Sequence, residues 1–238
     1  MDSLIDTDKK AGCRLLDATL YAAPLLHGLV ALTERFDALA RLPGLDEDIA
    51  GLFRQSADTV YEGVKACIYA PGPRIMDQSR FLMEVEFLLY DLTARPESVD
   101  EWKTAEPFRR NQLFGFGKLR SRREADLGYP RGQVLPVRDE YSSHSALVHP
   151  RPARELTVPD ETPSARRFYL TADLADLFGH AVQVSNAADD ALEGFLAEDR
   201  FSERDASSFP DPEIVTRAHD FIADWHAKLG IRTPPHPG

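Results

Sequence analysis

The chain has 238 residues, of which 43% are hydrophobic and 28% charged, and its formal net charge is −11. This length and composition predict one sizeable core and exclude global disorder, while the acidic balance excludes a protein that coats nucleic acid or anionic membrane through its overall field. The polar, acidic start and the lack of an apolar run of about 18 residues predict a cytoplasmic protein without a membrane span. Cys13 and Cys67 stand among apolar residues and are expected to be core residues in a reducing compartment.

The spacing of apolar residues predicts three helices in the first hundred positions. The first covers residues 9–42, and Pro24 is expected to bend or interrupt it before Pro43 ends it. The second begins near Asp46, because acidic residues suit the start of a helix. The third covers residues 75–94 and is apolar around much of its circumference, which is typical of a central element.

Shorter elements are expected in the middle of the chain. Ser98 can cap a short helix, and residues 107–125 are predicted to form another that Gly115 weakens. A loop containing glycine and proline then leads into a predicted helix over residues 137–148.

The last third begins with a polar, proline-containing linker over residues 154–164. A short strand is predicted at residues 167–170, followed by a long helix over 171–195 and a last helix over 212–229. The expected fold class is therefore all-α, a single-domain bundle of six or seven helices over residues 1–238.

One predicted helix concentrates side chains that can form hydrogen bonds and transfer protons. Tyr141, Ser145 and His149 follow one another at four-residue spacing, and Arg138 lies one turn before Tyr141, so one helical face reads Arg, Tyr, Ser, His. The alternative is a polar helix end at which His149 binds nearby carbonyl groups.

A second polar pair stands on the apolar helix over residues 75–94. Arg80 and Glu84 are four positions apart, so on a buried face they should pair with each other or with a polar partner. If they reach the helix that carries His149, a polar pocket results in the bundle. Its predicted members are Arg80, Glu84, Tyr141, Ser145 and His149.

A basic stretch covers residues 107–138, with eight basic and two acidic residues, so it carries +6 while the rest of the chain carries −17. Arg120, Arg122 and Arg123 are the candidate phosphate contacts, and the interleaved phenylalanines could stack on bases. The alternative is a solvated helix whose aromatic residues face the core and whose arginines balance acidic neighbours.

The chain resembles a bacterial family of all-helical proteins associated with the wider HEPN class, over about Gln55 to Pro150. The matching features are the Arg80-x-x-x-Glu84 helix, the Arg95-Pro-Glu break before a short helix with a tryptophan, and the segment Tyr-x-x-x-Ser-x-x-x-His-Pro that begins at Tyr141. This resemblance implies a HEPN-like core over about residues 9–152 and further helices over about 165–230.

The HEPN resemblance also implies an activity. HEPN ribonucleases carry an arginine and a histidine separated by four to six residues, placed at a dimer interface, and they cut RNA without metal. Arg138 and His144, with five residues between them, match this spacing. An arginine can stabilise charge on the scissile phosphate while a histidine moves a proton near neutral pH. Two features depart from the pattern of these ribonucleases. Glu140 adds a negative charge where a phosphate would bind, and the histidine of the family-like segment is His149, whose spacing from Arg138 is too long.

No cofactor or metal is expected. Asp176 with His180, and His219 with His226, share helix faces, but a metal site needs three or four converging ligands. Three functions therefore stay open: an RNA-cleaving toxin or defence effector, a module that binds RNA, a small ligand or a partner, and a purely structural partner-binding protein. Self-association as a homodimer is expected, and membrane binding is not.

Overall fold

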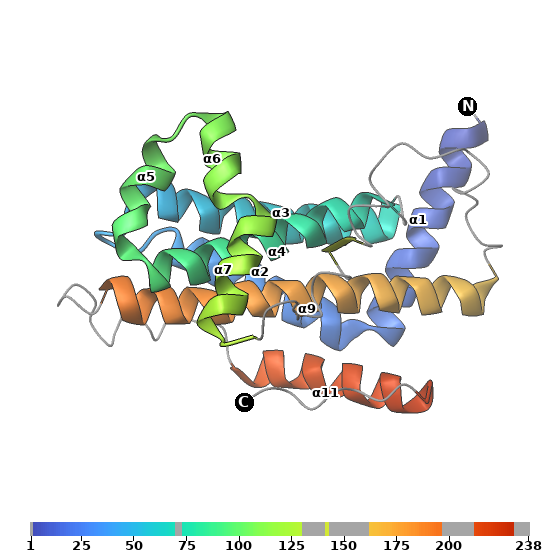
Figure 1. Cartoon of the computed structure of the whole chain (residues 1–238). Helices are drawn as coiled ribbons and strands as arrows, with labels where there is room; N and C mark the ends of the chain where they lie inside the picture. Colours follow the sequence, from blue (N-terminus) through green and yellow to red (C-terminus); the bar gives the residue numbers. More distant parts are fainter. Residues whose placement is uncertain (1, 70–72, 130–140, 143–161, 197–211, 231–238) are drawn as a thin grey trace.

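The computed structural model describes residues 2–69, 73–129, 141–142, 162–196 and 212–230, and within these ranges the chain forms helices and turns without a strand. The helices, shown in Figure 1, are α1 (Asp2–Tyr21), α2 (Ala23–Leu39), α3 (Glu47–Tyr69), α4 (Pro73–Ala94), the 3-10 helix η1 (Pro96–Ser98), α5 (Val99–Thr104), α6 (Pro107–Phe114), α7 (Phe116–Asp126), α9 (Pro163–Leu196) and α11 (Pro212–Lys228). The all-α prediction is confirmed. The described ranges hold nine α-helices where six or seven were predicted, partly because two predicted helices are each broken in two.

The first break separates α1 from α2 at Pro24. Proline fits the first turn of α2, where its missing N–H removes no helical hydrogen bond, but the same residue cannot continue α1. The segments Lys9–Tyr21 and Ala23–Leu39 are bent by 95° relative to each other. Consequently α1 leaves the body of the bundle at one end (Figure 1). The predicted interruption at Pro24 is confirmed.

The centre of the fold is the packing of α4 against α9, which is the most extensive contact between two helices. In Figure 1, α9 runs along the length of the molecule, and α11 lies beside it. One hydrophobic core includes Phe36 of α2, Phe53 of α3, Leu82 of α4, Phe178 of α9 and Ala218 of α11. The C-terminal helices therefore complete the same core as the N-terminal ones.

Two glycines let helices approach closely within this core. A Cβ added at Gly28 would lie 2.6 Å from Cε2 of Phe178 and 2.9 Å from Cβ of Ala218. A Cβ at Gly63 would lie 2.7 Å from Cδ2 of Leu177. Gly28 therefore needs the smallest residue, because the Phe178 ring and the Cβ of Ala218 leave no space, whereas at Gly63 the methyl groups of Leu177 would have to move.

The second break lies at Gly115, which ends α6 and begins α7 with extended backbone (φ −66°, ψ 147°). A Cβ at this position would meet the backbone oxygen of Asn111 at 2.5 Å, so the turn requires glycine. Ser98 precedes α5 as predicted, but its side chain makes no cap hydrogen bond. Its hydroxyl donates instead to the carbonyl oxygen of Arg95 at 2.7 Å.

The predicted strand at residues 167–170 is wrong, because this segment lies inside α9. Pro163 supplies the fixed φ that suits the first position of a helix. Leu170, Leu174 and Leu177 are buried at helical spacing, so the pattern of the long helix already includes this segment. By contrast, the predicted last helix over 212–229 is confirmed by α11.

Cys67 is buried as expected, Cys13 is only half-buried, and neither forms a disulfide. Considered one at a time, the described helices are too short or too polar to cross a membrane; only the bent combination of Lys9–Tyr21 with α2 meets the length and composition needed.

Candidate functional site

The predicted polar cluster forms around Tyr141, which meets two side chains of α4. Arg80 and Glu84 lie one turn apart on α4 and therefore face the same way. The Tyr141 hydroxyl donates to Oε1 of Glu84 at 2.6 Å. Nε of Arg80 donates to Glu84 Oε1 at 3.1 Å and to the Tyr141 hydroxyl oxygen at 3.0 Å. We call this triangle the Arg80–Glu84–Tyr141 cluster.

The aromatic ring of Tyr141 also contacts two helices. It stacks on Phe116 of α7 with ring centroids 3.7 Å apart and planes only 7° from parallel. Phe116 in turn meets Phe87 of α4 edge to face at 5.1 Å. The guanidinium carbon of Arg80 lies 5.3 Å from the centroid of the Tyr141 ring. Tyr141 is thus attached to both α4 and α7.

The protonation states in the cluster follow from its geometry. Burial raises the pKa of Tyr141 above its ordinary value, and the hydrogen bond to the Glu84 carboxylate raises it further. Burial by itself would lower the pKa of Arg80, but its interactions with Tyr141 and Glu84 raise it overall. The phenol therefore stays neutral, and the one cation and one anion compensate each other. The three side chains of the cluster are therefore better suited to holding Tyr141 in place than to transferring protons.

The structure brings together three of the five predicted pocket residues, Arg80, Glu84 and Tyr141. Two chain segments that the sequence predicted to meet, near positions 80 and 141, do meet. Ser145 and His149, and the predicted catalytic pair Arg138 and His144, lie outside the described residues.

The three candidate phosphate contacts of α7 all have intramolecular partners. Nη1 of Arg122 binds Oδ2 of the buried Asp91 at 2.7 Å, and the guanidinium also lies over the ring of Phe114. The remaining contacts are the ion pair of Arg120 with Glu124 and the stacking of Arg123 over the ring of Tyr90 at 4.1 Å. These contacts tie α7 to α4 and compensate much of its charge, and a role in phosphate binding stays a prediction.

The aromatic residues of the basic stretch divide between two environments. Phe114 and Phe116 are buried, whereas Phe108 is 76% exposed. Only Phe108 among the three offers an open ring face in the described part of the chain.

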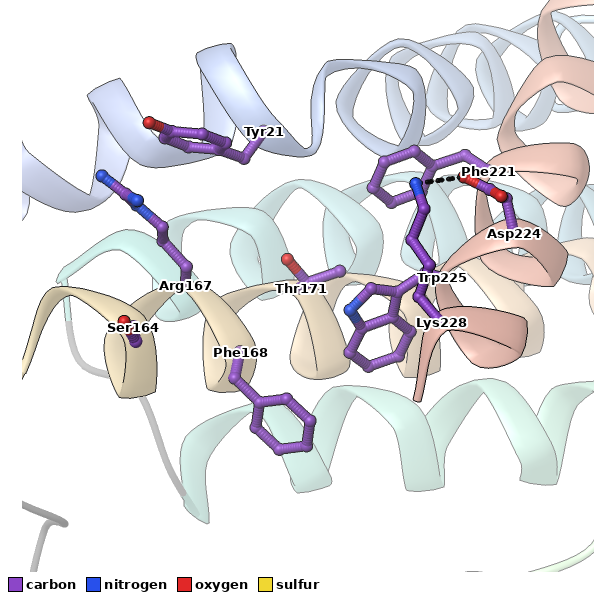
Figure 2. A pocket seen from close by; sticks show the side chains of 9 residues that line it. All are labelled: Tyr21, Ser164, Arg167, Phe168, Thr171, Phe221, Asp224, Trp225 and Lys228. Atoms are coloured by element: carbon purple, nitrogen blue, oxygen red, sulfur yellow. Dashed lines mark hydrogen bonds and ion pairs between the residues drawn. The ribbon is translucent and has the colours of Figure 1, made fainter. Parts of the chain in front are cut away.

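A groove lies between α1, α9 and α11, and the sequence did not predict it (Figure 2). Its volume is about 340 Å³, at the lower end of the range for small-molecule sites. Its lining residues are Tyr21, Ser164, Arg167, Phe168, Thr171, Phe221, Asp224, Trp225 and Lys228. In the sequence, the groove is indicated only by aromatic residues such as Tyr21, Phe168 and Trp225, which stand at helix positions that are not fully buried.

A third polar group is buried where α4 and α9 meet. Ser79 donates to Oδ2 of Asp176 at 2.6 Å, and Nε2 of His180 lies 3.7 Å from Oδ1 of the same carboxylate. Burial, together with the negative charge of Asp176, raises the pKa of Asp173 to about 7. Burial likewise raises the pKa of the Cys67 thiol, and both aspartates add to this effect. Within the described ranges, these and other acidic, histidine and cysteine side chains form no group of three arranged as metal ligands.

No protein-family model, curated protein or solved structure matches the chain. The relationship to the HEPN class therefore stays a prediction.

Proposed function

We propose that the protein is a HEPN-like, metal-independent ribonuclease whose catalytic segment, residues 138–149, is fixed to the bundle by the Arg80–Glu84–Tyr141 cluster. The observation that supports this proposal is the anchoring of Tyr141 by two hydrogen bonds and a parallel ring stack. Arg138 and His144 stand three positions before and after this anchored residue in the sequence. A catalytic pair needs such a rigid attachment, because small displacements of reacting groups cost large factors in rate.

In this proposal Arg138 and His144 carry the chemistry. The arginine stabilises the negative charge that develops on the scissile phosphate, and the histidine moves a proton near neutral pH. In this metal-independent reaction the neighbouring ribose 2′-hydroxyl oxygen attacks the phosphorus while its proton passes to His144. The bond from phosphorus to the 5′-oxygen breaks and this oxygen takes up a proton from water, so the products are a 2′,3′-cyclic phosphate and a 5′-hydroxyl. Arg80, Glu84 and Tyr141 are positioning residues, since their polar groups already bind one another.

The charge distribution fits a protein that acts on RNA without holding it tightly. The net charge of −11 repels polyanions at a distance. The arginines of α7 are compensated by acidic or aromatic partners, as with Arg122 and Asp91. We therefore expect weak, transient RNA contact whose affinity depends little on salt, because few phosphates would be neutralised.

Association with a second copy is part of the proposal, because the HEPN resemblance implies a site at a dimer interface. Support comes from α1, whose inward positions include the polar residues Arg14 and Asp17 while large apolar side chains face outward. These exposed side chains are Leu15 (49%), Leu16 (59%) and Leu20 (63%). An apolar face of this kind is typical of a protein-protein contact. Light scattering of the wild-type chain and of a Leu16→Gln/Leu20→Gln variant tests this, and the variant is expected to be monomeric.

The second candidate is a non-enzymatic binding module. It is favoured by the hydrogen bonding of the Arg80–Glu84–Tyr141 cluster, in which the Tyr141 hydroxyl both donates to Glu84 and accepts from Arg80. In that case the cluster serves only to hold a segment that contacts a partner.

Labelled RNA incubated with the protein in EDTA separates the two candidates. The ribonuclease proposal predicts that the wild-type chain cleaves the RNA and that an Arg138→Ala/His144→Ala double variant does not. It also predicts that the wild-type chain does not cleave an oligonucleotide in which every ribose is replaced by deoxyribose. Absence of cleavage by the wild type, or equal cleavage by both proteins, removes the ribonuclease. A rise in melting temperature with intact RNA and no cleavage would favour the binding module, because a bound ligand stabilises the folded state by mass action.

A further inference from the structure

The groove between α1, α9 and α11 combines a strip of α9 with two flanking aromatic walls. Ser164, Arg167, Phe168 and Thr171 follow one another at helical spacing and so line one side of α9. Figure 2 shows Tyr21 of α1 bordering this strip on one side and the α11 residues on the other.

The aromatic rings leave open faces for a flat ligand. Trp225 lies beside Phe168 with ring centroids 5.7 Å apart and planes inclined at 44°, so the two rings do not stack fully on each other. Phe168 is 43% exposed and Tyr21 47% exposed. A planar aromatic molecule inserted here would cover apolar surface that water now contacts.

The charged groups of the groove favour a single negative charge. Nε of Arg166 and Nε of Arg167 bind the two carboxylate oxygens of buried Asp17 at 2.7 and 3.0 Å, so two cations meet one anion. At the other end, Lys228 is neutralised by Asp224 at 2.5 Å. Among the described residues, these ion pairs therefore leave one positive charge more than they compensate, and it is shared by Arg166 and Arg167.

Arg167 is the member of that pair that lines the groove. Its guanidinium carbon lies 4.0 Å from the centroid of the Tyr21 ring, which holds the group in place. Its two terminal nitrogens make no hydrogen bond to any residue in the described ranges, and Ser164 adds a hydroxyl one turn away. A guanidinium with two parallel donors suits a carboxylate, sulfonate or phosphate.

We propose that this groove binds a small, flat aromatic compound with one acidic group, its rings against Trp225 and Phe168 and its acid on Arg167. This site is separate from the Arg80–Glu84–Tyr141 cluster and does not depend on the ribonuclease proposal.

Two fluorescent probes test the site on the full chain: 8-anilinonaphthalene-1-sulfonate, and N-phenyl-1-naphthylamine, which has the same rings without the acid. The wild type is expected to bind the sulfonate more tightly than the neutral probe. Arg167→Gln is expected to weaken the sulfonate about tenfold and leave the neutral probe unchanged, because one charge-assisted contact is lost. Trp225→Leu is expected to weaken both probes.

Two matched controls and a charge-preserving variant make the result specific. The double variant Asp224→Asn/Lys228→Gln should change sulfonate affinity little, because it removes this ion pair without changing the net charge, and Tyr61→Gln should not affect it, because exposed Tyr61 of α3 lies outside the groove lining. Arg167→Lys keeps the positive charge and should restore part of the affinity. The proposal is overturned by equal affinity for both probes, by an unchanged Arg167→Gln variant of native melting temperature, or by loss of binding in Tyr61→Gln alone.

Discussion

The Tyr141 hydroxyl lies 2.6 Å from Oε1 of Glu84, and this contact joins residues 57 positions apart in the chain. It attaches Tyr141, which stands three positions from each proposed catalytic residue in the sequence, to α4, the helix that packs most extensively on α9. The attachment involves both a charged acceptor and a ring stack, so its parts can be removed one at a time.

Tyr141→Phe removes the hydroxyl and retains the ring that stacks on Phe116. We expect the free energy of unfolding to fall by about 1–2 kcal/mol, because a hydrogen bond to a carboxylate and one from Arg80 are both lost. Chemical denaturation measures the change. Tyr129→Phe is the matched control, since no hydrogen bond from the Tyr129 hydroxyl to a described residue is present, and an equal loss in both variants would contradict the anchoring role.

Arg122→Ala separates a structural arginine from a phosphate contact. Asp91 is buried to 2% side-chain exposure and binds both Arg122 and Arg95, so removing one cation leaves its charge partly uncompensated. We expect a loss of about 1–3 kcal/mol in unfolding free energy. The exposed Lys118→Ala variant serves as the control. Unchanged stability of Arg122→Ala together with weaker RNA binding would instead support the phosphate contact.

Gly28→Ala tests the close packing of α2 on α9 and α11. The new methyl group would meet Phe178 and Ala218 at less than 3.0 Å, so we expect destabilisation by roughly 1–3 kcal/mol. Gly51→Ala on α3 is the control, because nothing lies within 4 Å of the added Cβ. There alanine should stabilise the helix by about 0.5–1 kcal/mol. Thermal melts of both variants should therefore shift in opposite directions, and shifts of the same sign would show that α2 packs differently.

The raised pKa of Asp173 predicts that the stability of the folded protein depends on pH. Its pKa is raised from an ordinary value of 3.8 to about 7 in the folded protein, so between these values the native state holds a proton that the unfolded state has lost. The contribution of this group to stability therefore falls by roughly 4 kcal/mol in total as the pH rises from about 4 to 7, and it is level above that.

Asp173→Asn should flatten this dependence and be more stable than the wild type at pH 8, since the buried carboxylate with Asp176 and Cys67 nearby no longer has to ionise. Denaturant unfolding at pH 5 and pH 8 measures both effects, with Asp58→Asn on the exposed surface of α3 as the control for removing one carboxylate. A variant that loses stability equally at both pH values would contradict the pKa assigned to Asp173.

Helical periodicity was enough to predict most of the fold. The apolar stripe of α3 and the nearly uniform apolarity of α4 depend on local spacing alone, and both helices lie where the sequence predicts them. The strand prediction at residues 167–170 failed because a run of four residues, two of them aromatic, cannot distinguish a strand from the first turns of a helix. The break at Gly115 needed a contact with the Asn111 carbonyl, which spacing does not reveal.

The candidate site was predictable in part for a similar reason. Arg80 and Glu84 on an apolar helix demanded a polar partner, and Tyr141 supplies it. The groove could not be predicted, because it forms from three helices whose relative placement depends on tertiary packing. The compensation of Arg122 by Asp91, across 31 positions, is likewise a property of the folded chain and not of a local pattern.

The most direct test of the central claim is the initial rate of RNA cleavage in EDTA, measured for the wild-type chain, His144→Ala and His149→Ala at equal concentration. The account predicts that His144→Ala abolishes cleavage, while His149→Ala, five residues further along and too distant from Arg138 in spacing, retains it. Abolition by His149→Ala with full activity of His144→Ala, or a rate that is the same in all three proteins, would contradict it.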